Sequence, residues 1–224
     1  MIQLSLRWVI MNSVEVLDLG LIYYKNAIIN PEKIIKEVED LDKKILNNKN
    51  KTIKTMASPW HPWNDKEQFF CWQKFFIPQE QIDKDDFFYD EIYSISKKLF
   101  SPLDEYLSKY KDFYPFLNVK SRDDSMHLLK YEKSGYLPAH QDHGVSTRTL
   151  SVLIYLNDDY EGGNLVFRNS NLSFKPEAGS ILFFPSNFLY VHEVEEITDG
   201  IKYSLPNWYH NVPKEKRYFS TGEA

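Results

Sequence analysis

Glycine is distributed very unevenly along this chain of 224 residues, and this asymmetry constrains the fold more than any other feature. Only Gly20 lies before residue 135, whereas seven glycines lie between Gly135 and Gly222. Glycine supplies the tight turns that connect short strands. The second half of the chain is therefore predicted to be rich in strands, and the first half to be largely helical.

The first half contains two apolar patterns at helical spacing. A helix is expected over residues 31–46, because Asn30 precedes a proline at the first turn. A second helix is expected from Asp85 or Asp86 to about Phe100, and a further turn or helix from the Ser101-Pro102 break to Tyr110. We expect these helices to buttress a sheet.

Three other segments of the first half are not helical in pattern. Residues 14–21 and 69–77 are expected to be strands. The segment Ser58-Pro-Trp-His-Pro-Trp63 is too rigid and aromatic for a regular element, so it is expected to be a loop. Such a loop either packs over the core or lines a pocket.

About eight short strands with turn signals between them are predicted in the second half, which favours a double-sheet sandwich or barrel. They are residues 126–131, the segment around His140, and residues 149–157, 164–168, 172–175, 180–185, 191–194 and 202–209. We expect one domain over residues 1–224, mainly β, with helical support over about 14–117 and a barrel core over about 118–212.

Composition narrows the functional classes. The net charge of −5 and the pI of about 5.7 give no reason to expect nucleic acid or an anionic membrane as a partner. Cys71 is the only cysteine, which excludes an intramolecular disulfide and a Cys-rich zinc module and fits a reducing compartment. No apolar run reaches the ~18 residues that span a bilayer. Residues 1–11 lack a basic n-region, a long apolar region and a small-residue cleavage site, so a signal peptide is not expected there, and Met11 is a second possible start. A cytoplasmic location is expected.

The segment around His140 and Asp142 is the strongest candidate for chemistry. In an extended chain these side chains lie on one face, roughly 6.5–7 Å apart along the strand. His192, in a later extended segment, is the candidate third ligand. Two histidines and a carboxylate are typical of non-haem Fe(II) oxygenases, although this set does not exclude zinc. The alternative for His140 and Asp142 is a surface histidine beside an aspartate.

The remaining histidines are weaker candidates. His143 lies three residues after His140 and therefore faces the other side of a strand. His61, His127 and His210 are expected to be structural or exposed to solvent, with His210 the one that could lie near the pocket.

Further motifs follow one another in a specific order. They are Tyr131, His140-Gln-Asp142, Tyr155-Leu-Asn157, Gly162-Gly-Asn-Leu-Val-Phe167, Gly179-Ser-Ile-Leu-Phe-Phe-Pro185, His192 and Gly200-Ile-Lys-Tyr-Ser-Leu-Pro-Asn-Trp208. Together they resemble the Fe(II)/2-oxoglutarate-dependent dioxygenases of the prolyl 4-hydroxylase-like branch over about residues 118–212. The resemblance implies a double-stranded β-helix, the jelly-roll or cupin-like barrel.

The resemblance also implies roles for individual residues. His140, Asp142 and His192 are the expected iron ligands, and Lys202 is expected to bind the distal carboxylate of 2-oxoglutarate where many relatives have arginine. Tyr131 and Tyr155 resemble the tyrosines that assist this contact, although Tyr155 could also be a plain core residue.

Lys202 supports this assignment independently of the family. It lies between apolar residues on a predicted strand, so its ammonium group needs an anionic partner unless it reaches solvent. Lysine acts as a point charge and needs hydroxyl groups beside it. Ser151 and Ser204 are weaker candidates for that help.

The implied activity is hydroxylation of an unactivated C–H bond. O2 and 2-oxoglutarate are consumed, succinate and CO2 are released, and ascorbate is the expected reductant. Asp142 favours hydroxylation, because halogenating relatives have a small residue at that position. A peptidyl residue, with proline favoured, is the expected substrate. The alternatives are a free amino acid or small metabolite, a catalytically silent barrel that acts as a binding module, and a zinc hydrolase, which leaves Lys202 unexplained. The oligomeric state stays open.

Overall fold

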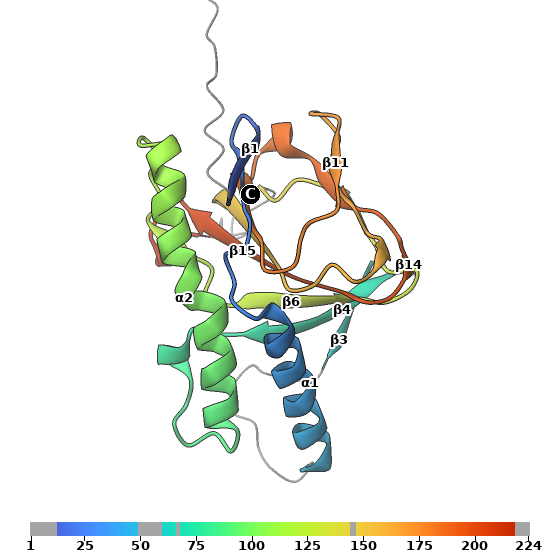
Figure 1. Cartoon of the computed structure of the whole chain (residues 1–224). Coiled ribbons are helices and arrows are strands. Elements are labelled where there is room, and N and C mark those ends of the chain that lie inside the picture. The colour runs from blue at the N-terminus through green and yellow to red at the C-terminus, as the bar shows by residue number, and fades with distance from the viewer. Residues whose placement is uncertain (1–12, 49–59, 66–67, 144–146, 218–224) are drawn as a thin grey trace, which may run out of the picture.

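The computed structural model describes residues 13–48, 60–65, 68–143 and 147–217. Strands dominate this part of the chain, with two helices, α1 (Pro31–Asn47) and α2 (Tyr89–Phe113). The prediction of a mainly β fold with helical support is confirmed (Figure 1). Neither helix has an apolar stretch long enough to cross a bilayer.

The larger sheet has nine strands, and its order along the hydrogen-bonded path is β1-β2-β12-β8-β15-β6-β4-β3, with β5 beside β15. These strands are β1 (Val14–Asp18), β2 (Leu21–Tyr24), β3 (His61–Asp65), β4 (Gln68–Phe76), β5 (Ser121–Arg122), β6 (Met126–Tyr131), β8 (Arg148–Tyr155), β12 (Ile181–Pro185) and β15 (Lys202–His210). Every pairing in this sheet is antiparallel.

The second sheet has four strands in the order β11-β10-β13-β7 and also pairs antiparallel. These strands are β7 (Leu137–His140), β10 (Leu165–Phe167), β11 (Leu172–Phe174) and β13 (His192–Val194). A small ladder joins β9 (Glu161–Gly162) to β14 (Ile197–Asp199). The strands β5, β9 and β14, of two or three residues each, were not predicted from the sequence.

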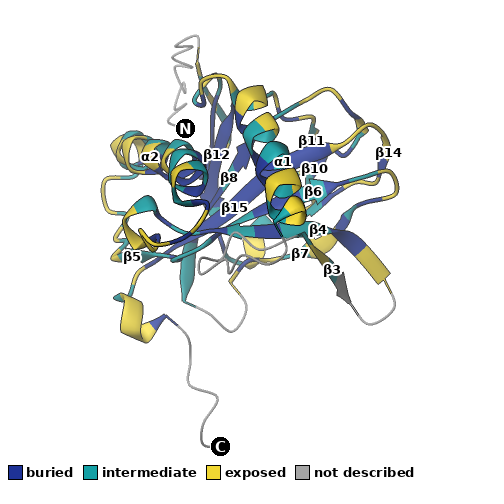
Figure 2. Ribbon diagram, turned by 90° about the horizontal axis from the view of Figure 1, so that it is seen from below, coloured by how far each residue is buried: buried dark blue, intermediate teal, exposed yellow. Residues whose placement is uncertain are grey.

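Two apolar clusters lie on opposite faces of the larger sheet. On β12, Ile181 and Phe183 belong to the cluster that includes the buried stripes of both helices. Leu182 and Phe184 belong to the cluster between the two sheets. Because successive residues of a strand point to opposite faces, a strand buried on both faces is a continuous apolar run. Figure 2 shows these central strands buried and the outer faces of α1 and α2 exposed.

The first half supplies four strands to the larger sheet, so the prediction that it is largely helical was only partly right. The strand expected over residues 14–21 is the hairpin of β1 and β2, which turns at Gly20 with a φ of 80°. The strand expected over 69–77 is confirmed as β4. The loop expected up to Trp63 is wrong from His61 onward, because β3 pairs there with β4. Pro62 is tolerated because β3 is an edge strand.

Helix α1 is confirmed almost to the residue, whereas α2 differs from the prediction. It begins at Tyr89 and continues without a break through Pro102 to Phe113. Asp86 lies before the helix, where its carboxylate accepts a hydrogen bond from the Phe88 backbone N–H at 3.0 Å. The buried side chains of Leu99 and Leu103 on either side of the proline pack into the core. This burial outweighs the lost backbone hydrogen bond at Pro102.

Candidate metal and cosubstrate site

His140 and His192 lie side by side on the second sheet. His140 ends β7, His192 begins β13, and the two residues are direct partners in the antiparallel register. Asp142 follows two residues after β7. One potential ligand atom from each of the three side chains lies within 4.8 Å of the other two. The structure thus brings together the three residues that the sequence proposed as ligands.

Both imidazole rings are oriented by the backbone. The Nδ1 atom of His140 lies 2.9 Å from the carbonyl oxygen of Pro138, and Nδ1 of His192 lies 3.0 Å from that of Tyr190. A carbonyl only accepts, so each Nδ1 carries the proton and each Nε2 presents a lone pair. These Nε2 atoms lie 3.6 and 3.8 Å from the Asp142 carboxylate oxygens. Such a donor set fits a divalent metal ion.

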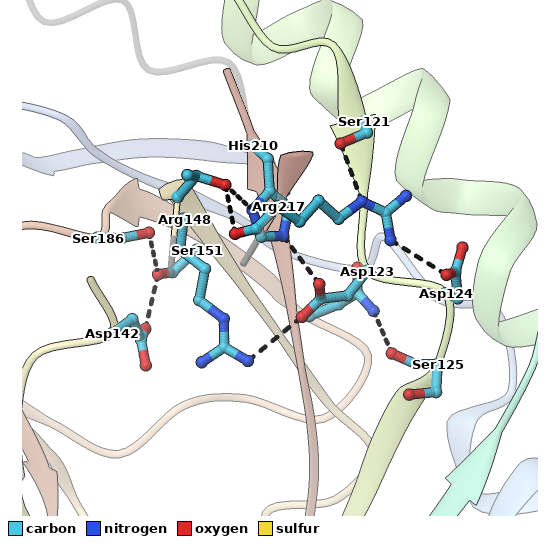
Figure 3. A network of polar contacts seen from close by, with 12 residues as sticks. Ser121, Asp123, Asp124, Ser125, Asp142, Arg148, Ser151, Ser186, His210 and Arg217 are labelled. Atoms are coloured by element: carbon cyan, nitrogen blue, oxygen red, sulfur yellow. Dashed lines mark hydrogen bonds and ion pairs between the residues drawn. The ribbon is translucent and has the colours of Figure 1, made fainter. Parts of the chain in front are cut away.

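Asp142 is buried and held as a carboxylate. Its Oδ2 accepts a 2.6 Å hydrogen bond from the Ser151 hydroxyl, which lies 2.8 Å from that of Ser186 (Figure 3). Burial by itself opposes the charge, but His140, His192 and Ser151 outweigh it and hold the Asp142 pKa well below its usual range. Ser151, considered from sequence as a cosubstrate contact, orients this carboxylate instead.

Burial and the charge of Asp142 also act on the pKa values of both histidines, with opposite net results. Burial lowers the pKa of His192, and the nearby Asp142 charge only partly offsets it. Burial also disfavours the charged form of His140, but its contact with Asp142 outweighs that effect and raises its pKa. The other histidines lie outside this cluster. The Nδ1 atom of His143 lies 2.6 Å from the Arg148 carbonyl oxygen, and the His127 ring packs against Phe75.

A narrow cavity extends from this cluster into the space between the sheets. Tyr131, Tyr155 and Ser204 line it together with His140, Asp142 and His192. The other lining side chains are mostly apolar: Trp63, Leu129, Leu137, Leu153, Leu165, Val194, Pro206 and Trp208. Of the aromatic segment expected to pack on the core or line a pocket, Trp60 does the first and Trp63 the second. Ser58 and Pro59 lie outside the described residues.

Lys202 is fully buried beside this cavity, opposite Tyr131 in the β15–β6 pairing. Its Nζ atom donates a 2.6 Å hydrogen bond to the carbonyl oxygen of Gly163. No carboxylate within the described ranges forms an ion pair with Lys202. Burial, with a smaller effect from the charge of Lys175, lowers the pKa of Lys202 to about 7.

The hydroxyl groups near Lys202 fit an anionic ligand. The Tyr155 hydroxyl is buried and has no hydrogen-bond partner among the described residues. The Tyr131 hydroxyl contacts the side chains of Ser204 and Cys71. A buried ammonium group without a counter-charge, beside the unpaired Tyr155 hydroxyl, is costly unless a ligand interacts with both. The arrangement therefore suits a carboxylate entering from the cavity.

A second polar network adjoins the cavity and was not predicted from sequence (Figure 3). His210 is fully buried, and its Nε2 atom lies 2.8 Å from Asp123 Oδ1. Arg148 lies 3.3 Å from the other carboxylate oxygen of Asp123 and stacks 3.6 Å from the ring centre of Trp208. His210 is therefore near the pocket, but its connection to the pocket is indirect. It contacts Asp123, Asp123 pairs with Arg148, and Arg148 stacks on Trp208, which lines the cavity. No local motif identifies Asp123 or Arg148, because their partners are distant in sequence.

Comparison with known proteins agrees with this geometry. Residues 126–210 match the family model of the 2OG-Fe(II) oxygenase superfamily. The resemblance is confirmed. The name of this family states its metal and its cosubstrate, and all six predicted site residues lie within the matched segment.

Two hydroxylases are similar in sequence to part of this chain. A PKHD-type hydroxylase of Rippkaea orientalis is 29% identical over 113 residues, which are 45% of this chain and 50% of that protein. Prolyl 3-hydroxylase 2 of Homo sapiens is 33% identical over 67 residues, 28% of this chain and 10% of the human protein. The chain thus spans half or less of the length of these relatives.

Solved structures show the same fold. A prolyl hydroxylase from Trichoplax adhaerens, in complex with a hypoxia inducible factor oxygen degradation domain peptide fragment, superimposes with a TM-score of 0.62 at 18% identity, covering 86% of this chain and 84% of that one. The viral collagen prolyl hydroxylase of Paramecium Bursaria Chlorella virus-1 gives 0.56 at 15% identity, with coverage of 86% and 96%. The predicted double-stranded β-helix is confirmed.

Proposed function

We propose that this protein is an Fe(II)- and 2-oxoglutarate-dependent hydroxylase that acts on peptidyl residues, with proline as the favoured target. One observation carries the proposal: two histidines and a carboxylate meet at a cavity beside which a lysine is buried, and no counter-ion for this lysine lies among the described residues. A zinc hydrolase would give Lys202 no role.

His140, Asp142 and His192 would hold the iron through two Nε2 atoms and one carboxylate. When bound, the metal supplies the redox chemistry that converts O2 and 2-oxoglutarate to succinate and CO2 while a substrate C–H bond is hydroxylated. Ascorbate is our proposed reductant. The hydrogen bond from Ser151 holds the Asp142 carboxylate in place, and the Pro138 and Tyr190 carbonyls hold the imidazoles.

Lys202 would bind the distal carboxylate of 2-oxoglutarate, with Tyr131 and Tyr155 as hydrogen-bond donors. The pKa values of both tyrosines are raised well above the ordinary value by burial, so both keep their hydroxyl protons at neutral pH. The apolar walls, including Leu153 and Pro206, exclude water from the cosubstrate.

The substrate assignment rests on names of similar proteins. The structural neighbours above are prolyl hydroxylases, and one of them was solved with a peptide fragment. The matched relatives include prolyl 3-hydroxylases and PKHD-type hydroxylases. A peptidyl prolyl side chain is therefore favoured over a free amino acid or metabolite.

The proposal is tested by measuring 2-oxoglutarate turnover with and without Fe(II), against proline-containing peptides and a metabolite panel. We expect iron-dependent succinate together with one oxygen atom added to a peptidyl proline by mass spectrometry. His192→Ala should abolish both products. His143→Ala is the matched control, because His143 is close in sequence but hydrogen-bonded outside the cluster.

Other outcomes would overturn the ligand assignment or favour one of the alternative functions. Iron-dependent succinate that survives His192→Ala would overturn the ligand assignment. An oxygenated free amino acid or metabolite, without any modified peptide, would establish the small-molecule alternative. If the protein binds neither iron nor 2-oxoglutarate, the proposed function fails and the alternative of a catalytically silent barrel is favoured.

A further inference from the structure

Tyr160 lies close to two ammonium groups. It is buried in the turn between β8 and β9. The Nζ atom of Lys202 lies 5.4 Å from the centre of its ring, and Nζ of Lys175, just after β11, lies 4.9 Å from it. Both distances are within the range of cation–π attraction. Lys175 also donates a hydrogen bond to the Tyr160 carbonyl oxygen.

The position of this ring is fixed by two glycine turns. A Cβ atom at Gly163 would lie 3.1 Å from the Tyr160 ring, and one at Gly200 would lie 3.0 Å from the Tyr160 Cα. Both glycines have positive φ angles. The carbonyl oxygen of Gly163 also accepts the hydrogen bond from Lys202. The backbone therefore holds the ring and the Lys202 ammonium group in one arrangement.

Neither ammonium group is neutralised by a carboxylate within the part of the chain that the structure describes. Asp158 accepts a hydrogen bond from the Ala178 backbone N–H and Asp159 one from Asn157. Burial raises the pKa values of the surrounding tyrosines, so these remain uncharged. The titratable groups around Lys202 and the Tyr160 ring are Tyr23 on β2, Tyr131 on β6, Tyr155 on β8, Asp158, Asp159 and Lys175.

We propose that Tyr160 is a positioning residue of the 2-oxoglutarate subsite, whose ring holds Lys202 and couples carboxylate binding to the charge of Lys175. This inference rests on the proposed function. The ring attracts the Lys202 ammonium group and aids its protonated form, whereas the positive charge of Lys175 opposes that form. The two residues therefore act in opposite directions on the pH range over which the cosubstrate carboxylate is bound.

Two substitutions distinguish the contribution of the Tyr160 ring from that of its hydroxyl. The hydroxyl is buried without a hydrogen-bond partner among the described residues, so it contributes little to holding Lys202. Tyr160→Phe keeps the ring, and Tyr160→Leu removes it. Lys175→Met removes the second charge at an exposed residue, so this variant tests the proposal even if Tyr160→Leu does not fold.

The test is calorimetric titration of the iron-loaded, O2-free protein with 2-oxoglutarate between pH 6 and pH 9. The unchanged protein should lose affinity as the pH rises above about 7, where Lys202 loses its proton. Lys175→Met should shift this loss to higher pH and bind 2-oxoglutarate more tightly than the unchanged protein at pH 8, because the charge that opposes protonation of Lys202 is gone. Tyr160→Leu should bind about 2- to 30-fold more weakly near neutral pH, and Tyr160→Phe should restore most of the affinity.

The matched control is Lys109→Met. Lys109 lies on α2, and its Nζ atom is 4.2 Å from the centre of the Tyr106 ring, a lysine–tyrosine contact outside the cavity. This variant should leave the pH profile of binding unchanged. A second readout needs no metal: the pH dependence of unfolding of the ligand-free protein should also move to higher pH in Lys175→Met.

The outcomes separate this inference from the proposed function. If the unchanged protein does not bind 2-oxoglutarate at any pH, the proposed function fails. If it binds, but Lys175→Met keeps the original pH profile and folded Tyr160→Leu keeps the original affinity, the inference fails and the proposed function stands. Equal losses in Tyr160→Phe and Tyr160→Leu would assign the effect to the hydroxyl and also overturn the inference.

Discussion

Lys202 occupies a buried position that an apolar side chain would fill at a lower free-energy cost. Its ammonium group donates a hydrogen bond to the Gly163 carbonyl oxygen, and its pKa is lowered to about 7 by burial and the charge of Lys175. Lysine in the unfolded chain has a pKa near 10.4. Folding therefore works against the charge of Lys202, which is explained if the residue is retained for binding an anion.

The first prediction is that Lys202→Met stabilises the ligand-free protein while removing 2-oxoglutarate binding. Below pH 7 Lys202 is charged in both states and its burial cost is fully present. Between about pH 7 and 10.5 only the unfolded chain holds the extra proton, so the unfolding free energy contributed by this residue rises with pH. At pH 7 the substitution should add on the order of 3 kcal/mol in urea unfolding and remove this rise.

Lys74→Met is the matched comparison for that prediction. Lys74 is equally buried, but it forms an ion pair with Asp42 of α1. Removing it leaves that carboxylate without its cation, so this variant should lose stability. A Lys202→Met protein that is less stable than the original at pH 7 would contradict the argument.

The residues expected from sequence and those found only in the structure differ in one physical respect. The period of a strand predicted that His140 and Asp142 converge, and they do, although β7 ends at His140 and Asp142 lies just after it. His192 was predicted from its place in an ordered series of motifs. By contrast, Ser151 reaches Asp142, and Tyr160 reaches Lys202, across strands and turns whose geometry no local pattern encodes. Long-range contacts of this kind require the fold.

At the scale of elements, apolar runs and turn signals predicted most strands of the two main sheets, but not β3, β5, β9 or β14. The Ser101-Pro102 pair led us to expect a helix boundary, but none exists there, because the local cost of proline is smaller than the stabilisation from burial on both sides of it. The predicted helical support is present as α1 and α2, but the first half of the chain also contributes β1 to β4 to the larger sheet. Hairpins with aromatic and proline residues are hard to distinguish from loops.

Arg217, directly after the 3₁₀ turn Lys214–Lys216, contacts the start of β8, the strand that follows His140 and Asp142 in the chain. The carbonyl oxygen of Arg217 accepts hydrogen bonds from the Thr147 backbone N–H at 3.0 Å and its hydroxyl at 2.7 Å. The Arg217 side chain, 6% exposed, is anchored to Ser121 and Asp124 (Figure 3). The start of β8, close to Asp142, is thus tied to residues distant in sequence.

The second prediction is that Arg217→Ala weakens the attachment of Arg217 to the start of β8, because the contacts of its side chain with Ser121 and Asp124 are lost. The substitution should lower the unfolding free energy by about 1–3 kcal/mol, because the buried Arg217 side chain is lost and Ser121 and Asp124 lose a charged donor, and it should speed amide hydrogen exchange at Thr147. Lys214→Ala is the control, since Lys214 pairs with the same Asp124 but is 63% exposed. It should change stability by no more than about 0.5 kcal/mol. Equal effects of the two variants would contradict the prediction.

At the scale of the whole molecule, the candidate site joins the two sheets. His140 and His192 belong to the four-stranded sheet, whereas Lys202, Tyr131 and Tyr155 belong to the nine-stranded sheet, which α1 and α2 buttress (Figure 1). A ligand that contacts both ends of the cavity would connect the two layers. We propose that residues 14–212 form one domain, so that this connection would stabilise the fold as a unit.

The third prediction concerns thermal unfolding with bound cosubstrate. A ligand that binds only the folded state stabilises it by about 2.7 kcal/mol at a concentration of 100 times its Kd. For a domain of this size each kcal/mol raises the Tm by roughly 2–4 °C, so 2-oxoglutarate with Fe(II), without O2, should raise the Tm by about 5–11 °C. Lys202→Met should begin at a higher Tm and gain little from 2-oxoglutarate, because the distal carboxylate has lost its cation. A full shift in Lys202→Met would place that carboxylate elsewhere in the cavity.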